Sequence, residues 1–229
     1  MALVLNGSND TITGLQINSA NIVDGSIVNA DINSSAAIAS SKISGVSAGW
    51  VHAAEVTLPT NASTVTLTGV PDGASHIRYL IRYMSFAGVA QTKFRVQKST
   101  TGGVKSIINS NYVAYSTYAN EGGSVGGGGN TDGMDLFDAY SNAGNSHFGS
   151  VDVYRIGTNG SDGTNYFFVH HGITMSSSGS TQATLQANGY IELGSSSTDF
   201  ISGAEFFSNT GANFDNGYIN QSYLLSWVK

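Results

Sequence analysis

STVTLTGVPDGASHIRYLIRYMSF, the stretch from Ser63 to Phe86, decides the fold class. Its first eight residues alternate polar and apolar side chains, with Val65 and Leu67 in the apolar positions. Strict alternation is typical of a strand that buries one face. A Pro-Asp-Gly turn signal follows at 71–73, and residues 76–86 are then rich in β-branched and aromatic side chains. The stretch therefore predicts two strands joined by a turn.

Similar strand signals continue along most of the chain beyond residue 49, and no segment there has the 3.6-residue apolar stripe of a helix. We therefore expect an all-β fold, an antiparallel β-sandwich that is jelly-roll-like. The exception is the polar stretch 99–147, whose glycine run GGSVGGGG at 122–129 predicts a loop. The other expected strands are 50–58, 91–98, 148–156, 165–175, 181–193, 199–208 and 217–227.

The composition narrows the classes of function. The chain has 229 residues, of which 10% are charged, with a net charge of −6 and no cysteine. Soluble domains average about 25% charged residues, so we expect a mostly neutral, polar surface. The absence of a basic run argues against a nucleic-acid partner, and no apolar run is long enough for membrane insertion. Without cysteine there are no disulfides or thiolate metal sites, and we expect neither a cofactor nor a metal.

A change in composition near Gly49 and Trp50 predicts two parts, an N-terminal segment 1–47 and a head domain 48–229. In the first part, isoleucine recurs every five residues, a period that fits neither a strand nor a helix. So short a repeat cannot bury a continuous apolar face alone. We expect it to associate with copies of itself or with another protein, and a Ser/Asn-rich linker with accidental spacing is the alternative. The isoleucines are Ile12, Ile17, Ile22, Ile27 and Ile32.

The five-residue pattern resembles pentapeptide repeats, in which a large apolar residue and a small one point inward. Over residues 11–45 it is also similar to the N-terminal leader of bacteriophage tail-fibre proteins, most clearly in IVNADINSSAAIASSKI at 27–43. The resemblance implies that this segment is an oligomerisation and attachment stem. It further implies a homotrimer and a second virion protein bound at the N-terminus.

The head domain resembles a β-sandwich found in structural proteins of marine and cyanobacterial phages. The matching features are Trp50 before a strand, VTLTGVP at 65–71, HIRYL at 76–80, ANFDNGYI at 212–219 and YLLSW at 223–227. The resemblance carries no catalytic signature, and it is weakest over 99–147. It implies a virion protein whose head recognises the host surface.

Three tyrosines recur every third residue within the 99–147 stretch, among asparagine and serine. Tyrosine offers a rigid aromatic face with a hydroxyl, and asparagine and serine offer adaptable hydrogen bonds. We expect this region to contact a host surface glycan, and packing of the tyrosines on the sandwich edge is the alternative. The candidate contact residues are Asn111, Tyr112, Tyr115, Tyr118, Asn130 and Asp132.

Two patterns that could indicate catalysis lack their context. GGSVG at 122–126 matches the G-x-S-x-G of a nucleophile elbow, but no strand and helix are expected around it. The fifteen acidic residues of the chain are scattered, whereas general acid–base catalysis needs positioned pairs. We therefore expect no enzyme activity.

Two further patterns could indicate a metal. Asp132, Asp135 and Asp138 do not have the spacing of a calcium-binding loop, and we expect them to be solvated loop acids. His170 and His171 are adjacent in an expected strand, so their side chains point to opposite faces. We expect one to be packed and the other exposed, which prevents them from sharing a metal.

The first functional hypothesis is therefore a tail fibre or other external virion appendage whose head recognises host polysaccharide without catalysis. A capsid fibre or decoration protein with a mainly structural role is the alternative. A carbohydrate-binding module or a glycan-degrading enzyme outside a virion is the third hypothesis.

Overall fold

The computed structural model describes residues 49–100, 105–110, 112–120, 125–130, 133–137, 145–158, 164–175, 181–193 and 199–225. The chain divides into two units, Met1–Val46 and Ser47–Lys229, and every described residue belongs to the second. The five isoleucines of the repeat lie outside the described residues, so the stem stays a prediction. The described residues form strands, turns and loops, and none of them belongs to a helix that could cross a membrane.

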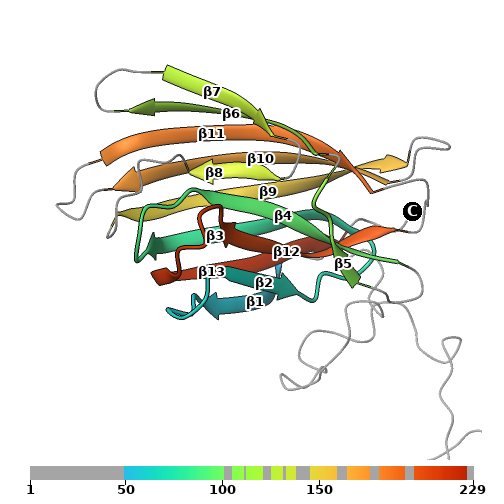
Figure 1. The fold of residues 1–229 in the computed structure, drawn as a ribbon. Coiled ribbons are helices and arrows are strands. Elements are labelled where there is room, and N and C mark those ends of the chain that lie inside the picture. The colour runs from blue at the N-terminus through green and yellow to red at the C-terminus, as the bar shows by residue number, and fades with distance from the viewer. Residues whose placement is uncertain are drawn as a thin grey trace, which may run out of the picture. The chain divides into compact units, whose positions relative to one another are not determined.

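The larger sheet has eight strands in the order β1-β13-β3-β9-β10-β11-β6-β7. Figure 1 shows them stacked from β7 at the top to β1 at the bottom. In this order they are β1 (Val51–Thr57), β13 (Phe214–Leu225), β3 (Ala74–Phe86), β9 (Ser146–Thr158), β10 (Thr164–Met175), β11 (Thr181–Glu192), β6 (Tyr112–Asn120) and β7 (Val125–Asn130).

The smaller sheet has five strands and lies in front of the larger one in Figure 1. Its order is β2-β12-β4-β5, and β8 also pairs with β4. The strands are β2 (Thr64–Thr68), β12 (Phe200–Ser208), β4 (Thr92–Ser99), β5 (Lys105–Ile107) and β8 (Met134–Phe137).

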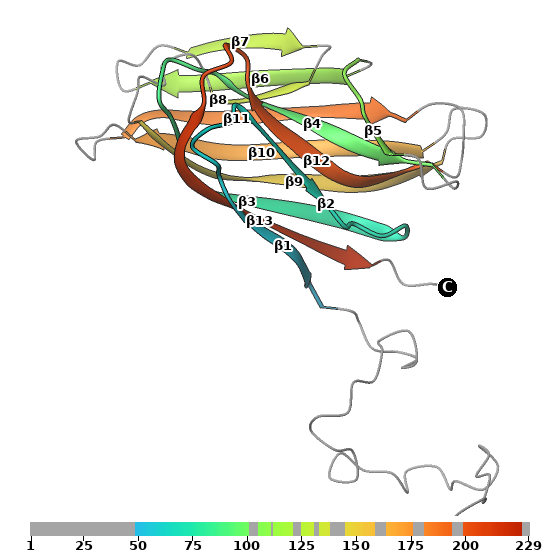
Figure 2. The same ribbon diagram turned by 60° about the horizontal axis from the view of Figure 1, so that its bottom comes forward.

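Strands from the two ends of the head domain interleave in both sheets. β13 lies between β1 and β3, and β12 lies between β2 and β4, always in antiparallel pairing. Figure 2 shows β2 and β12 lying across the strands of the larger sheet. The expected all-β fold, an antiparallel β-sandwich, is confirmed.

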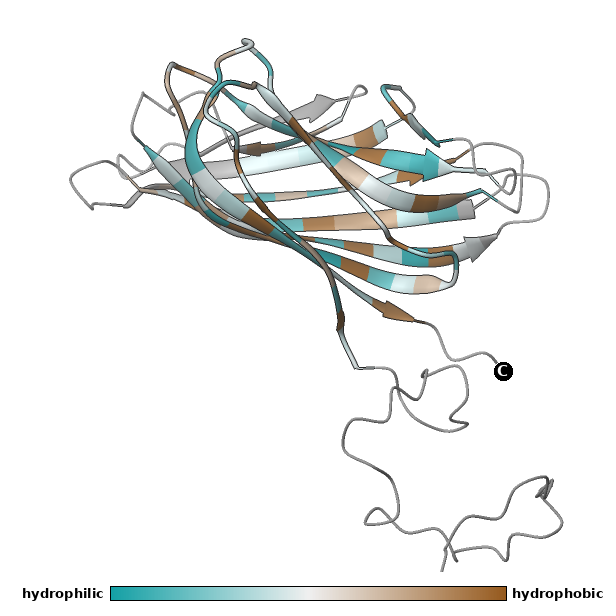
Figure 3. Cartoon of the chain, turned by 90° about the horizontal axis from the view of Figure 1, so that it is seen from below, coloured by the Kyte–Doolittle hydropathy of each residue, from teal (hydrophilic) through white to brown (hydrophobic). Residues whose placement is uncertain are grey.

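The core lies between the sheets and follows the alternation seen in the sequence. In β2, Val65 and Leu67 are buried between exposed threonines, and Figure 3 shows hydrophobic and hydrophilic segments alternating along the strands. The centre of the core is aromatic: the Tyr79 ring lies 5.5 Å from both Phe94 and Phe206, with edge-to-face geometry. Tyr79 belongs to the larger sheet and the two phenylalanines to the smaller one, so these contacts join the layers.

Four strands, β5, β6, β7 and β8, lie within the polar stretch 99–147, where the sequence predicted none, and the loop expected at the glycine run is wrong for the part from Val125 onward. The second part of the glycine run forms β7, which pairs with β6 from Ala114–Asn130 to Ala119–Val125. Strand pairing satisfies backbone N–H and C=O groups whatever the side chains are, so a glycine run can form a strand without any side-chain pattern. Asp135 is likewise not a solvated loop acid: it belongs to β8, is mostly buried, and lies 3.6 Å from the ammonium of Lys93.

Candidate functional site

The outer face of the larger sheet carries a row of aromatic side chains. In the strand register His76 is opposite Tyr154, Tyr154 is opposite Phe167, and Phe167 is opposite Tyr190. Successive strand side chains point to opposite faces, and these four share the face that points away from the core. We call Trp50, His76, Tyr154, Phe167 and Tyr190 the aromatic row. All five side chains are exposed or half-buried.

Ring contacts fix one end of the aromatic row. The Trp50 ring meets the His76 ring edge-on at 4.5 Å, and the His76 ring stacks on Tyr154 at 4.1 Å. The guanidinium of Arg78 lies 5.0 Å from the centre of the Trp50 ring. Rings held by such contacts have little conformational freedom left to lose, so this end of the aromatic row is a preorganised surface.

Asp152 lies beneath this end and anchors its polar groups. Its Oδ1 atom is 2.6 Å from His76 Nε2 and accepts a hydrogen bond of 2.7 Å from Arg78 Nε. The Ser150 hydroxyl donates to Oδ2 at 3.3 Å. The Asp152 side chain is only 8% exposed, so the carboxylate is held under the surface and its charge is compensated by Arg78.

The same cluster contains serine, histidine and aspartate, but not in the arrangement of a nucleophilic triad. A triad places the histidine between the serine hydroxyl and the carboxylate. Here the hydroxyl of Ser150 and the imidazole of His76 both bond to Asp152, which leaves Ser150 without the histidine as its base in this geometry. Asp152 instead orients the side chains of His76, Arg78 and Ser150 at this end of the aromatic row.

The aromatic row is long enough for an extended ligand to lie along it. Neighbouring strands lie about 4.8 Å apart, so the four strands from β3 to β11 carry the row across roughly 14 Å. The flat faces of aromatic rings complement apolar patches of a ligand. The tyrosine hydroxyls, at the edge of the ring, donate and accept hydrogen bonds. Next to Tyr190, on the same face, lie Val113, Asn188 and Tyr115, since Tyr190 pairs with Val113 and Asn188 with Tyr115.

The structure separates the tyrosines that the sequence grouped. Tyr115 is 56% exposed and belongs to the outer face, beside the aromatic row. Tyr112 is 1% exposed, so its assignment as a contact residue is wrong. A spacing of three places two residues of one strand on opposite faces, and the face of Tyr112 is the core.

The remaining candidates are described in part or not at all. Tyr118 and Asn130 are described as backbone positions in β6 and β7, opposite Leu185 and Ala114. Asn111 and Asp132 lie outside the described residues.

The adjacent histidines behave as expected: His170 is fully buried and His171 is exposed. Burial lowers the pKa of His170 from 6.5 to about 4. His147 is buried nearby on β9, and burial together with the positive charge His170 would carry lowers the pKa of His147 from 6.5 to about 3. Both are therefore neutral core residues at neutral pH. The described part of the chain contains no group of three or more potential ligands that could hold a metal.

The aromatic row is not among the sites that the sequence predicts, although part of its signal is present in the chain. Tyr154 occupies an outward position between the buried Val153 and the half-buried Arg155, and Tyr190 alternates with Gly189 and Ile191. The signal that could have marked these positions is an aromatic residue at a strand position whose side chain is expected to point to solvent. That they form one row depends on which strands are neighbours.

Neither a scan against protein-family models nor a search of curated proteins finds a match for this chain.

Proposed function

We propose that this chain is a phage virion protein, a tail fibre whose β-sandwich head recognises a neutral host surface polysaccharide without catalysis. The observation that carries the recognition part is the aromatic row across the outer face of the larger sheet. Exposed apolar side chains that form a continuous surface mark interaction sites more strongly than scattered ones do.

The charges on this face favour a neutral ligand. Arg78 is paired with Asp152, and Arg82 with Glu55, at 2.7 and 3.3 Å. Along β11 the same face exposes the neutral side chains of Asn188 and Tyr190 together with the carboxylate of Glu192. A neutral sugar chain can hydrogen-bond to such a surface through its hydroxyl groups, whereas an acidic chain would be repelled by the carboxylate of Glu192.

The virion part of the proposal rests on the resemblance of residues 11–45 to the leader of tail-fibre proteins. An N-terminal stem would bring several heads together, as a homotrimer attached to another virion protein. Copies displayed together raise the effective concentration of weak sites, which suits recognition of a repetitive polysaccharide. A capsid decoration protein remains the second candidate, because the same exposed row could serve as a contact between subunits.

Calorimetric titration of the full chain with laminarin, mannan and dextran, and with alginate as the acidic counterpart, tests the proposal. We expect a neutral polysaccharide to bind. Replacing Phe167→Ala and Tyr190→Ala together should weaken binding about tenfold for each ring without lowering the melting temperature. Val89→Ala is the control, because Val89 is exposed in the turn between β3 and β4.

Two outcomes would contradict the recognition role. The first is that no polysaccharide binds, and the second is that the double variant binds as well as the unchanged chain. If the double variant has a smaller native mass than the unchanged protein, its oligomer has dissociated. The aromatic row would then be a contact between subunits, which would favour the decoration role.

A further inference from the structure

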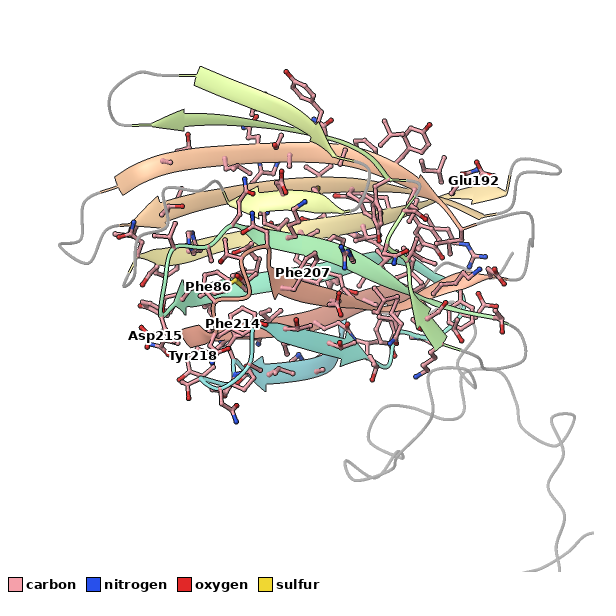
Figure 4. All side chains as sticks on the ribbon, viewed as in Figure 1. Phe86, Glu192, Phe207, Phe214, Asp215 and Tyr218 are labelled. Carbon is pink, nitrogen blue, oxygen red and sulfur yellow. The ribbon has the colours of Figure 1, made fainter. Side chains whose placement is uncertain are left out.

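A depression lies on the outer face of the larger sheet, at the other end of β3 from the aromatic row. It has a volume of about 290 Å³ and is lined by Glu55, Arg82, Tyr83 and Tyr218. We call it the tyrosine pocket. In Figure 4, Tyr218 lies at the lower left, at the opposite end of the molecule from Glu192, which is the β11 neighbour of the aromatic row.

The polar groups of the tyrosine pocket are held in a closed network. Arg82 Nη2 donates to Glu55 Oε2 at 3.3 Å and to Asn220 Oδ1 at 3.2 Å, and Asn220 Nδ2 donates to Glu55 Oε2 at 2.7 Å. The guanidinium also lies 5.8 Å from the centre of the Tyr218 ring. An exposed ion pair of this kind adds little stability. Its effect is to hold donors and acceptors at fixed positions beside an aromatic ring.

Tyr83 reaches this pocket through an unusual backbone conformation. Its φ angle is +56°, and it is the described non-glycine residue with a positive φ. The pairing of β3 with β9 shifts between Ile81 and Met84, which marks a β-bulge. The bulge allows the neighbours Arg82 and Tyr83 both to be exposed, where regular alternation would bury one of them.

The opposing strand has a glycine where the bulge requires one. A Cβ atom on Gly217 would lie 2.7 Å from the Cα of Met84, and the φ of Gly217 is +129°. A tyrosine in the left-handed region is strained, and such strain clusters at functional sites. The Tyr83 ring is 54% exposed and meets Phe148 edge-on at 4.6 Å, so the strain presents this ring at the surface instead of burying it.

We infer that the tyrosine pocket is a second sugar-binding subsite, which holds one or two neutral sugar units of the same polysaccharide chain that binds the aromatic row. This inference rests on the proposed function and specifies its ligand. The Tyr83 and Tyr218 rings contact the apolar faces of a sugar. Glu55 and Asn220 accept hydrogen bonds from its hydroxyls, and Arg82 donates to them. Because Glu55 compensates the charge of Arg82, the pocket favours a neutral sugar over an acidic one.

The separation of the two sites fixes the length of ligand that can reach both. His76 and Arg82 share the outer face of β3, six positions apart, which corresponds to roughly 20 Å along the strand. A trisaccharide occupies one site at a time, whereas a longer chain spans both. Linking two weak sites through one ligand raises its affinity by effective concentration.

The test compares a trisaccharide with an octasaccharide prepared from laminarin, and the corresponding fragments of mannan, each titrated into the full chain. For the unchanged protein we expect the octasaccharide to bind roughly 100-fold more tightly. Tyr83→Gly removes the ring and accepts the positive φ, and Tyr218→Ala removes the second ring. In both variants the octasaccharide should bind no better than the trisaccharide. Tyr83→Phe should retain most of the tighter binding of the octasaccharide over the trisaccharide, which we call the octasaccharide gain. Val89→Ala should retain all of it.

The outcomes separate this inference from the proposed function. If the octasaccharide gain persists in both Tyr83→Gly and Tyr218→Ala, the second subsite is wrong while recognition by the aromatic row stands. If no fragment or polysaccharide binds the unchanged protein, both are wrong. A Tyr83→Gly chain that is less stable and keeps the gain shows that the strained tyrosine serves packing, which also overturns the inference.

Discussion

The hydroxyl of Tyr112 accepts a hydrogen bond of 2.7 Å from the backbone N–H of Val96. The same hydroxyl donates to the carbonyl oxygen of Ile108 at 2.9 Å. Tyr112 belongs to β6 of the larger sheet and Val96 to β4 of the smaller one, so a side chain of one layer satisfies the backbone of the other. A residue that the sequence suggested as a surface contact thus joins the two sheets inside the core.

Replacing Tyr112→Phe should destabilise the head domain by about 1–3 kcal/mol, because it leaves buried backbone groups without their partner. Tyr115→Phe is the matched control in the same strand, and we expect a change within about 0.5 kcal/mol because its side chain is exposed. Urea denaturation of both variants checks this. Equal stability of the two variants would contradict the bridging role.

Acid should weaken the fold through the buried histidines. The pKa of His147 falls from 6.5 to about 3, and that of His170 from 6.5 to about 4. Between these values the unfolded chain binds more protons than the folded one, so the free energy of unfolding decreases as the pH falls. The contribution is complete above pH 6.5 and is lost progressively below it, down to about pH 3.

Melting temperatures measured from pH 7.5 to pH 4 check this dependence. His147→Gln should flatten the slope below pH 6.5, since glutamine does not titrate, while Val89→Ala should leave it unchanged because Val89 is exposed and carries no titratable group. The same slope in all three proteins would show that other groups cause the acid sensitivity.

Gly203 is expected to be intolerant of any side chain. It lies in β12 between β2 and β4, and an added Cβ would collide with the carbonyl oxygen of Leu67 and lie 3.0 Å from the Cα of Thr68. Gly203→Ala should therefore cost about 2 kcal/mol or more, by forcing the central strands apart. At Gly88 an added Cβ meets Ala212 Cβ at 3.6 Å, an ordinary contact. Chemical denaturation that finds Gly203→Ala as mild as Gly88→Ala would contradict this.

The isoleucine repeat makes a separate prediction about assembly. Replacing Ile22→Asn and Ile27→Asn together should dissociate the oligomer and leave the head domain folded, because a short repeat needs copies of itself to bury its apolar row. Native mass and circular dichroism measure the two effects. We would compare these with a chain beginning at Ser47. An unchanged number of subunits in both proteins would show that residues 1–46 do not assemble the protein.

The sequence by itself determined which segments of the head domain are strands wherever one face is buried. Val65 and Leu67 in β2, and Ile77, Tyr79 and Ile81 in β3, alternate because the core takes every second side chain. The same logic failed at β7, where glycines leave no pattern to detect. It also failed at Tyr112 and Tyr115. Their spacing of three places them on opposite faces of β6, whereas the sequence grouped them as one contact surface.

Only the tertiary structure decided where the candidate surfaces form. His76, Tyr154, Phe167 and Tyr190 are far apart in the chain, and they form one row because β3, β9, β10 and β11 are neighbours in register. Likewise Glu55 and Asn220 meet Arg82 because β13 lies between β1 and β3. Alternation is a local consequence of backbone geometry, so a single strand reveals it. Strand order and register depend on long-range packing, which no single segment encodes.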